Sequence, residues 1–577
     1  MPSPINKLTN LPNTSPSHLI VLMKLSSLVR LAFVLAKSAS RSSAATIDVR
    51  AAIGSWSPIL DLPLSPISGA LLPTGEFVLW AGKNPGGWAD NTLGTTQTNY
   101  VIMTLDQLVD GSPLHMNITK NPEMFCPGTT NLVNGDLLVN GGSGPEATIL
   151  FDLSTKSWKQ GGLMNIPRGY NSNALTISGN VFTIGGSFAK SFFDKRTNHT
   201  FGLGGKDGEL WTPSSEGGTW MITNKGSGNI IGGIEDGSTS PDPQGIYRSD
   251  NHAWLFPYKS TAGEDKIFHA GPSHKMHDIN ISNGTTQYIG NRGADPYSIN
   301  GNAVQYIPGH VLKFGGAPYY GDTHSSVGKP TTATALMLNY TGMPNGGLPI
   351  VTSAGKMNFP RSFGHSVVLP GGKILIVGGQ TAIHLFSDET GVLTPEIYDP
   401  IYGTFTKVAD MATARNYHSL AMLMKDGSVI IAGGGAAQNR CSVSGQSPCT
   451  PDVHFNAEVY SPPYLDSGNE RPVISHVSTG VLATYGPQLS VGAEMNVSTS
   501  GCGSVCSYEL IRLHSATHSV NNDQARVPLE IVKRDMVKGD IVTIDRTYAA
   551  FIIPGYYYLF AISSKQTPSV ASIVHVV

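Results

Sequence analysis

Charged residues are scarce in this sequence. Lys and Arg number 38, Asp and Glu number 40, and together they make up only 14% of the 577 residues. The formal net charge of −2 and the absence of any Lys/Arg run leave no electrostatic footprint for nucleic acid or for an anionic membrane surface. No stretch of about 18 apolar residues follows the N-terminal segment, which excludes a membrane-spanning helix there. We therefore expect neither nucleic acid nor a membrane as a partner.

Cysteine is also rare, with five residues, an odd number. Cys441 and Cys449 lie in one Gly/Ser/Pro loop, and Cys502 and Cys506 flank a Gly-Ser-Val turn, so each pair predicts a local disulfide in an oxidising compartment. Cys126 is then left over. A lone cysteine is either a small buried apolar residue or a residue with its own chemistry, and both interpretations stay open at this point.

The first 45 residues are typical of a targeting segment. Two short apolar patches, at 19–23 and 31–36, precede a small-residue stretch that ends at Ala45. If translation begins at Met23, Lys24 supplies the charged n-region and cleavage falls near Ala45, although Arg30 interrupts the apolar h-region. This predicts a secreted, extracellular protein. Sequons for glycosylation agree with secretion, at Asn117, Asn198, Asn280, Asn283, Asn339 and Asn496.

Glycine and proline are abundant, with 66 and 38 residues, which indicates an all-β chain of short strands joined by tight turns. The glycines follow a repeat: one glycine, five mostly apolar residues and a glycine pair. Repeats of roughly 45 to 60 residues with this signature are typical of kelch-type β-propeller blades. Clear copies begin at Gly135, Gly179, Gly309, Gly372 and Gly427, and a sixth, with Ala81 replacing one glycine, begins at Gly75.

The spacing predicts seven blades over 47–463. The interval between Gly186 and Gly309 must hold a degenerate blade, because a propeller ring cannot leave a gap. A β-sandwich array is the alternative, but it does not explain the doubled glycines. Aromatic residues that follow several copies are expected where a strand packs against the next blade: Trp158, Trp220, Tyr398 and Tyr460.

The sequence pattern changes at Arg471, where the glycine pairs of the repeat stop. Alternating strands follow, as in 556–561, separated by turns. This predicts a separate immunoglobulin-like β-sandwich over 471–577.

Four short segments combine metal-ligand side chains with Gly, Pro or Arg: Phe-Cys-Pro-Gly at 125–128, Arg-Gly-Tyr-Asn at 168–171, Arg-Asn-Tyr-His at 415–418 and Ser-Ala-Thr-His-Ser-Val at 515–520. Two imidazoles and two phenols form a tetragonal set that suits Cu(II). Adjacent strand residues point to opposite faces, so Tyr417 and His418 can share a metal only at a strand end or bulge. Taken singly, each is equally a core tyrosine or a satisfied buried histidine, and the residues alone leave the metal site open.

In this order, and together with Tyr-Arg-Ser-Asp-Asn-His-Ala-Trp-Leu-Phe at 247–256 and Pro-Ser-Val-Ala-Ser at 568–572, the segments resemble galactose oxidase and its relatives. These are copper-radical oxidases, kelch-propeller enzymes related to glyoxal oxidase. The resemblance covers most of the chain from about Gly75 to Val577. It implies a copper-dependent enzyme that oxidises a primary alcohol, aliphatic, aryl or galactose-type, to an aldehyde while O2 becomes hydrogen peroxide.

The resemblance also implies roles for five residues. Cys126 and Tyr170 would form a thioether-linked radical cofactor, which accounts for the odd cysteine count. Tyr417 would be the axial ligand and the proton acceptor, and His518 would be donated by the C-terminal domain. The full set of implied copper ligands is Tyr170, Tyr417, His418 and His518.

For the substrate pocket the resemblance is less complete. Phe188 stands where galactose oxidase stacks a tryptophan on the radical, and Gly321 stands where the family has a pocket glutamine. Losing that polar side chain predicts a wider pocket and weaker sugar discrimination. No N-terminal carbohydrate-binding sandwich is found, so the mature chain is expected to begin with the propeller, as in general alcohol oxidases. Residues that match the pocket lining are Gln244, Tyr247, Arg248 and Phe386.

Two alternatives stay open: a glyoxal oxidase-type enzyme that prefers small aldehydes, and a non-catalytic propeller that binds glycans. The match around Tyr247 and Arg248 argues against the first, and the intact ligand set argues against the second. We expect a monomer whose peroxide is consumed by a peroxidase, or which meets a one-electron activator. The cluster His269, His274 and His277 fits no strong metal template and is expected to consist of solvated loop residues.

Overall fold

The computed structural model describes residues 50–85, 97–186, 191–194, 199–202, 205–224, 251–295, 297–321, 327–435, 452–535 and 537–577, all within one unit, Val49–Val577. Several predicted features lie outside the described residues: the segment 1–45, Asn198, Phe188, Gln244, Tyr247, Arg248 and the cysteines Cys441 and Cys449. The described part contains little helix, and no helix there is long and apolar enough to cross a bilayer. Its helices are α2 (Arg50–Ile53), α3 (Leu105–Val109), α6 (Pro463–Asp466) and the 3-10 helices η1 (Met343–Asn345) and η2 (Arg546–Phe551).

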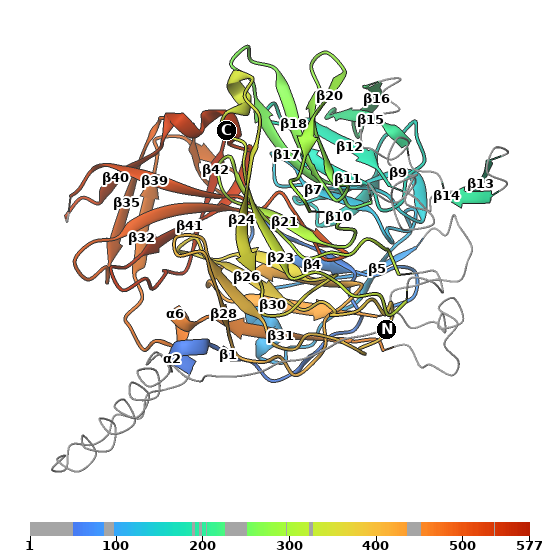
Figure 1. Cartoon of the computed structure of the whole chain (residues 1–577). Helices are drawn as coiled ribbons and strands as arrows, with labels where there is room; N and C mark the ends of the chain where they lie inside the picture. The colour runs from blue at the N-terminus through green and yellow to red at the C-terminus, as the bar shows by residue number, and fades with distance from the viewer. Residues whose placement is uncertain are drawn as a thin grey trace, which may run out of the picture. The chain divides into compact units, whose positions relative to one another are not determined.

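In the described residues, seven antiparallel blades of four strands each follow one another and form a propeller (Figure 1). Further strands extend the sheet of the first blade to six strands and that of the last blade to five. The first strands of neighbouring blades contact one another at six of the seven boundaries and so surround the central axis. At the boundary between the first and second blades, a strand of the C-terminal region, Ser515–Thr517, contacts both first strands. This confirms the predicted seven-bladed propeller. The strands are β3 (Ser68–Leu71), β4 (Phe77–Trp80), β5 (Thr98–Met103) and β6 (Asn117–Thr119); β7 (Gly128–Asn131), β8 (Leu137–Gly141), β9 (Gly144–Asp152) and β10 (Ser157–Gln160); β11 (Ser172–Leu175), β12 (Val181–Gly185), β15 (Gly205–Thr212) and β16 (Thr219–Thr223); β17 (Trp254–Lys259), β18 (Asp265–Gly271), β19 (Lys275–Asn280) and β20 (Thr285–Asn291); β21 (Asn302–Ile307), β22 (His310–Phe314), β23 (Thr334–Asn339) and β24 (Ile350–Lys356); β25 (His365–Val368), β26 (Ile374–Val377), β27 (Glu396–Asp399) and β28 (Thr404–Lys407); and β29 (Ser419–Leu423), β30 (Val429–Gly433) and β31 (Asn456–Ser461) with β1 (Ser55–Trp56).

The two ends of the propeller sequence meet in the last blade. Its outer strand is β1, which pairs with β31 in the register Ser55↔Ser461 and Trp56↔Tyr460. The short strand β2 (Leu60–Asp61) also pairs with β31. Joining the beginning of the propeller to its end closes the ring through backbone hydrogen bonds, so no blade is left with a free side. A further hairpin, β13 (Ser191–Asp194) and β14 (His199–Gly202), forms a separate two-stranded sheet.

Each glycine repeat coincides with the second strand of a blade. The five apolar residues form the buried strand, as in β26 and β30, whose residues are all buried. The glycine pair follows where neighbouring blades meet: a Cβ on Gly433 would lie 2.1 Å from the carbonyl oxygen of Pro66 in the adjoining blade. The degenerate blade is β17–β20, in which Ala270-Gly271 replaces the pair. The repeat therefore marks the inter-blade contact, and β17–β20 fills the interval as expected.

The aromatic residues after the repeats lie between blades, as predicted. Trp158, Trp220, Tyr398 and Tyr460 are each no more than 9% exposed. The Trp158 ring lies edge-on to Trp80 of the preceding blade, with centroids 5.7 Å apart. The Trp220 indole N–H donates to the Thr148 hydroxyl, also in the preceding blade, at 2.7 Å. Aromatic rings bury a large apolar area, which explains their use at these contacts.

Residues with left-handed backbone precede the first strand of six blades. Positive φ is uncommon for residues with a side chain, and its recurrence at one place in the fold indicates a common constraint. The residues are Cys126 (φ 60°), Tyr170 (φ 64°), His252 (φ 51°), Asn300 (φ 61°), Phe363 (φ 59°) and His418 (φ 70°). Three of these side chains, Cys126, Tyr170 and Phe363, meet in one buried cluster. The propeller thus delivers a set of side chains to one end of its axis.

The C-terminal strands form a nine-stranded arrangement in the order β32-β35-β40-β39-β36-β41-β42-β34-β33 (Figure 1). Their core contains the fully buried residues Leu510, Tyr557 and Leu559. A disulfide joins Cys502 to Cys506, with Cα atoms 5.0 Å apart. The strands are β32 (Val473–Ser478), β33 (Leu482–Ala483), β34 (Gly486–Leu489), β35 (Glu494–Ser500), β36 (Ser507–Arg512), β39 (Arg526–Lys533), β40 (Asp540–Ile544), β41 (Gly555–Ile562) and β42 (Ser572–Val576).

A hairpin from this C-terminal region enters the propeller. Its strands β37 (Ser515–Thr517) and β38 (Val520–Asn522) extend the first blade, because β37 pairs with β3 in the register Ser68↔Thr517. Next to the hairpin lies a cavity of about 30 Å³, lined by residues that include Gln305, Asn521 and Asp523. This volume holds about one water molecule. The hairpin therefore occupies the axis of the propeller and carries His518 in its turn.

One expectation about the histidines was wrong. His269 lies on β18 and His277 on β19, both are buried, and their Nδ1 atoms are 3.1 Å apart. They are therefore paired strand residues of the degenerate blade, whose weak repeat hid these strands; only His274 lies in the turn between them. Asn280 is also buried, so this sequon does not present its side chain to solvent.

Replacing Gly433 by Ala tests the inter-blade contact. Its φ of +73° and the 2.1 Å approach to the Pro66 oxygen both penalise a Cβ, so Gly433→Ala should lower the free energy of unfolding by about 2–4 kcal/mol. Gly403 is a matched control, with φ +65° and no atom within 4 Å of its Cβ position. Gly403→Ala should cost only about 1 kcal/mol. Denaturant unfolding measures both, and equal losses would contradict the contact argument.

Asp523, beside the hairpin, should make stability depend on pH. Burial raises the pKa of Asp523 to about 6, although the Arg512 guanidinium, 3.7 Å away, opposes the shift. The folded protein then binds this proton more tightly than the unfolded chain, so the residue costs stability as pH rises from about 4 to about 6. Asp523→Asn removes that cost. Its melting temperature relative to wild type should rise between about pH 4.5 and about pH 7.5. A constant difference across this range would exclude the effect.

Candidate metal centre

Five of the predicted site residues converge at one end of the propeller axis. Cys126, Tyr170, Tyr417, His418 and His518 are all buried. The hydroxyls of Tyr170 and Tyr417 are 2.6 Å apart, although the residues are 247 positions apart in the chain. The Cys126 sulfur and one ring nitrogen each of His418 and His518 lie within 4.8 Å of one another. Residues from three different blades and from the C-terminal hairpin therefore share one small volume.

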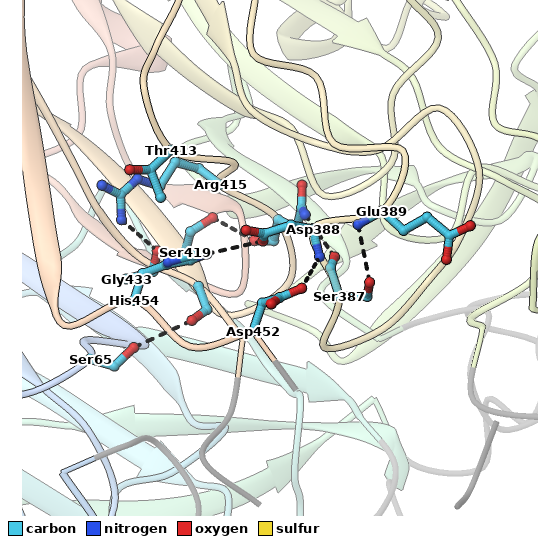
Figure 2. Close-up of polar contacts among 12 residues, drawn as sticks. Ser65, Ser387, Asp388, Glu389, Thr413, Arg415, Ser419, Gly433, Asp452 and His454 are labelled. Carbon is cyan, nitrogen blue, oxygen red and sulfur yellow. Dashed lines mark hydrogen bonds and ion pairs between the residues drawn. The ribbon is translucent and has the colours of Figure 1, made fainter. Parts of the chain in front are cut away.

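Buried arginines fix the segments that carry the two tyrosines. The Arg415 guanidinium binds Glu458 at 3.2 Å. It also donates to the Gly433 carbonyl at 2.9 Å, a contact drawn in Figure 2. Arg168 binds Glu209 at 3.2 Å and the Gly185 carbonyl at 3.1 Å. In each case the arginine stands two positions before the tyrosine. The same pair of contacts, one to a glutamate and one to a glycine carbonyl, therefore positions Tyr170 and Tyr417 in their two blades.

His418 directly precedes β29, at a strand end as the sequence requires for two adjacent ligands. Its ring stacks on Tyr417 with centroids 3.9 Å apart. Nδ1 lies 2.9 Å from the Gly435 carbonyl oxygen, which can only accept, so Nδ1 carries the proton. Nε2 is buried and has no hydrogen-bond partner among the described residues. The protein thus presents the lone pair of Nε2 to the site.

His518 is oriented in the same way from the other side. Its Nδ1 lies 2.7 Å from the Thr517 hydroxyl, which in turn accepts a hydrogen bond from Ser68 of β3 at 2.7 Å. The Nε2 atom of His518 is buried and, within the described ranges, also lacks a partner. The pairing of the hairpin with the first blade therefore determines where this imidazole points.

Burial decides the protonation of these groups. It lowers the pKa of His418 to about 4 and that of His518 well below its usual value, with His418 and His252 adding to the effect on His518. It raises the pKa of the Tyr170 and Tyr417 phenols and of the Cys126 thiol. At neutral pH the site therefore presents two neutral imidazoles and two neutral phenols. Neutral imidazole is the form that binds metal ions, and a cation would favour loss of the phenol protons.

The donor set fits a Cu(II) ion. Two buried imidazole nitrogens without a partner are costly in an empty site, and a metal ion satisfies both at once. Nitrogen and phenol oxygen donors in a tetragonal arrangement suit Cu(II). Cys126 is a free thiol hydrogen-bonded to Tyr170, and the Tyr170 amide donates to the Cys126 carbonyl at 3.0 Å. The thiol is thus held beside one phenol ring.

Two further residues belong to this site and were not singled out from the sequence. The Tyr320 hydroxyl lies 2.9 Å from the Tyr417 hydroxyl, so a third phenol joins the pair. The His252 ring stacks on His518 at 5.2 Å and meets the Tyr170 ring edge-on at 5.1 Å. His252 stands in the run 247–256 that carries the resemblance, and Tyr320 directly precedes Gly321 of the implied pocket. These positions in the sequence were the available signal, but the contacts of both residues depend on the fold.

Among the pocket residues, Phe386 is described and covers the site. Its ring centroid is 5.4 Å from Tyr417 and 5.6 Å from His418. The expected widening at Gly321 is not found at that point. Gly321 has φ +103°, and the place of its Cβ is taken by Ile383, whose Cγ2 lies 2.0 Å away. An apolar side chain from the neighbouring blade fills the space, so polarity is lost there without a gain in room.

Comparisons with known proteins agree with this geometry. Residues 471–576 match the family model described as "Galactose oxidase-like, Early set domain", and 348–464 match "Glyoxal oxidase N-terminus". An aldehyde oxidase of Arabidopsis thaliana is 29% identical over 38% of this chain and 36% of its own length. A solved structure described as a novel fungal alcohol oxidase with catalytic diversity among the AA5 family, in complex with copper, is 29% identical. It has a TM-score of 0.74 and covers 91% of this chain and 99% of that one.

Similarity over nearly the whole sequence is found with a protein of Gibberella zeae named galactose oxidase. It is 35% identical, covering 91% of this chain and 71% of the relative. The match spans both the propeller blades and the C-terminal strands that together form the metal centre. The chain therefore belongs to the galactose oxidase family.

Proposed function

We propose that this protein is a copper-dependent oxidase that converts primary alcohols to aldehydes while reducing O2 to hydrogen peroxide. The alcohol loses two electrons and two protons, and one O2 takes up both to give one H2O2. The observation that carries the proposal is the pair of buried, unpartnered imidazole nitrogens facing two hydrogen-bonded phenols. The relatives named galactose oxidase and fungal alcohol oxidase, which cover 91% of the chain, support it.

Tyr170, Tyr417, His418 and His518 are the proposed copper ligands. When bound, the copper ion supplies a Lewis acid and a one-electron acceptor. Tyr417 is the proposed proton acceptor for the alcohol hydroxyl, since its oxygen faces the site and lies 2.6 Å from the Tyr170 oxygen. Tyr320, 2.9 Å from the same oxygen, is placed to donate a hydrogen bond that holds it in position. Phe386 excludes water from one side of this group.

Cys126 and Tyr170 are the proposed second redox centre. A thioether between the sulfur and a Tyr170 ring carbon forms with loss of the thiol hydrogen and one ring hydrogen, and O2 is the oxidant that accepts these two electrons and two protons. Once O2 or the expected one-electron activator has removed one electron from the cross-linked ring, that oxidised ring would accept one electron from the alcohol, so that with copper the site would take both. The hydrogen bond between the thiol and Tyr170, and the burial of both, support this role.

For the substrate, we propose a primary alcohol of the general rather than the sugar-specific type. Ile383 in the space beside Gly321 makes this wall apolar. Gln244, Tyr247 and Arg248 remain proposed substrate contacts, and Phe188 a proposed cover for the Tyr170 ring. Glyoxal oxidase-type chemistry is the second candidate, because the aldehyde oxidases match 38% of the chain and one family model names glyoxal oxidase. The match to galactose oxidase over 91% favours the alcohol.

We further propose that 1–45 directs secretion, that 47–463 is the catalytic propeller and that 471–577 is the domain donating His518. In this proposal the mature protein is an extracellular monomer, and a peroxidase uses the peroxide.

Copper binding tests the ligand set directly. We expect one tightly bound Cu(II) per wild-type chain by equilibrium dialysis and metal analysis. His418→Ala and His518→Ala should each weaken binding by about 100-fold or more, since losing a ligand costs at least as much as losing a partner that orients one. His310 is a matched control, a half-buried histidine on β22 whose Nδ1 lies 3.1 Å from the Pro308 carbonyl. His310→Ala should bind copper normally, and unchanged binding in all three would refute the ligand set.

Peroxide release tests the reaction and its branch. Copper-loaded protein exposed to O2 should be lighter than the sequence mass by two hydrogen atoms, with 126 and 170 in one linked peptide. It should release peroxide from 1-butanol or benzyl alcohol, and Cys126→Ser should lose the mass change and at least about 100-fold in rate. A preference for methylglyoxal would move the protein to the glyoxal oxidase branch. Bound copper and an intact thioether without any peroxide would refute the substrate class.

A further inference from the structure

The loop between β26 and β27 carries Phe386 in a conformation that it does not favour alone. Phe386 has φ 63°, in the left-handed region, and it is half-buried against Tyr417 and His418. Such a conformation persists only where surrounding contacts hold it. Identifying these contacts therefore identifies what fixes the wall of the pocket.

From within its own blade, the loop is held by one buried amide. Gln380 is fully buried, and its Nε2 donates to the carbonyls of His384 and Ser387, each at 2.8 Å. The loop also contains a looser contact between His384 Nδ1 and Glu389, at 3.5 Å, with Glu389 largely exposed. These contacts organise residues 384–390 as a unit, but they do not tie it to the blade that carries Tyr417 and His418.

One tie to that blade comes from Asn416, whose Nδ2 donates to the Ser387 carbonyl at 2.9 Å, and the others come from residues 452–454 (Figure 2). The Asp388 carboxylate lies 3.0 Å from His454 Nε2, and the Asp388 amide donates to the Asp452 carboxylate at 2.7 Å. The Asp452 amide in turn donates to the Phe386 carbonyl at 3.1 Å. The Phe386 carbonyl and the Asp388 amide and carboxylate are thus all bonded across the blade boundary. We call Asp388, Asp452 and His454 the latch.

The latch is continuous with the backbone that orients His418. The His454 amide donates to the Gly434 carbonyl at 3.1 Å, and Val453 forms a β-bridge with Gly435. Gly435 accepts the Nδ1 proton of His418 at 2.9 Å, and its amide donates to the Tyr417 carbonyl at 2.8 Å. The segment 452–454 therefore contacts the Phe386 loop on one side and the support of His418 on the other.

We propose that the latch holds the Phe386 ring over Tyr417 and His418 and so sets the size of alcohol that the site accepts. Asp388, Asp452 and His454 are positioning residues, because none contacts the proposed ligands through its own side chain in the bonds described above. The inference rests on the proposed function for its substrate, but its structural part concerns only the loop. When the latch is intact the ring excludes bulky alcohols and packs on small ones; without it the ring is displaced and both effects weaken.

Hydrogen exchange on the metal-free protein tests the structural part without any activity. Asp388→Ala and His454→Ala should raise amide exchange across 384–390 by about tenfold, since each removes a bond that closes the loop. His454→Gln keeps an N–H donor and should restore much of the protection. Glu389→Ala is the control on the same loop: among the described residues this carboxylate contacts His384 of its own loop, so exchange should stay near wild type. Unchanged exchange in Asp388→Ala and His454→Ala would overturn the latch.

Kinetics then tests the consequence for substrates. For 1-butanol, Asp388→Ala and His454→Ala should raise KM about 5–10-fold and leave kcat within about twofold, because a packing contact is lost and the ligands are not. The preference for 1-butanol over a bulky primary alcohol should fall, as it should in Phe386→Ala. Adding Asp388→Ala to Phe386→Ala should have no further effect on this preference. An equal fall of kcat and kcat/KM for both alcohols, or an additive double variant, would overturn the specificity role.

The two proposals fail separately. If wild-type protein releases no peroxide from any alcohol, the oxidase proposal fails, while the exchange experiment still decides whether the latch holds the loop. If wild type is active and binds copper normally, but the latch variants change neither amide exchange nor the preference between alcohols, only the latch is refuted.

Discussion

The geometry of the metal centre depends on buried arginines at the axis of the propeller. Three of them occupy the same place in three blades, two positions before a ring side chain, and each binds a glutamate on the third strand of its blade. A buried ion pair adds little net stability, but removing one partner costs about 3–5 kcal/mol. The glutamate carboxylates also accept hydrogen bonds from backbone amides. These ion pairs therefore fix the positions of the segments that carry the rings more than they raise the free energy of unfolding. The three arginines are Arg168, Arg361 and Arg415.

This constraint links the fold to the site through the glycine repeat. The carbonyl that each arginine binds belongs to the first glycine of its pair, and the amide of the second glycine binds the arginine carbonyl of the next blade, as for Gly379 and Arg415 at 2.8 Å. The repeat therefore does more than end a strand. Through these hydrogen bonds it fixes the turn before the first strand of one blade relative to the same turn of the next blade. Side chains that are far apart in sequence therefore meet within hydrogen-bond distance. The C-terminal hairpin completes the set from the axis, since His518 comes from outside the blades.

Much of this was predictable from the sequence because it depends on repeated local chemistry. Five doubled glycines and one Ala-Gly variant revealed six blades directly, ring closure required the seventh, and two of the proposed ligand motifs contained the arginines. The sequence could not reveal the strand pair of His269 and His277, because Ala270-Gly271 breaks the repeat there. Nor could it reveal that Tyr320 meets Tyr417, or that Ile383 fills the space beside Gly321, since both contacts join different blades whose separation only the assembled ring determines. The same holds for Asp388 and His454, which lie in loops without any repeat.

The third arginine shows that the fold determines the position of a ring, whereas the residue type determines whether that ring can bind a metal ion. Arg361 binds Glu396 at 2.9 Å and stands two positions before Phe363, which has the same left-handed backbone as Tyr170. Phe363 packs edge-on against Tyr417, with centroids 5.1 Å apart, and offers no donor. The blade thus supplies the geometry of a ligand position without the ligand. Propeller architecture therefore determines where donors can stand, whereas the choice of phenol or phenyl at such a position determines whether it can supply one of the four proposed metal ligands. For this reason the argument for function rests on Tyr170, Tyr417 and the two imidazoles, and not on the seven blades.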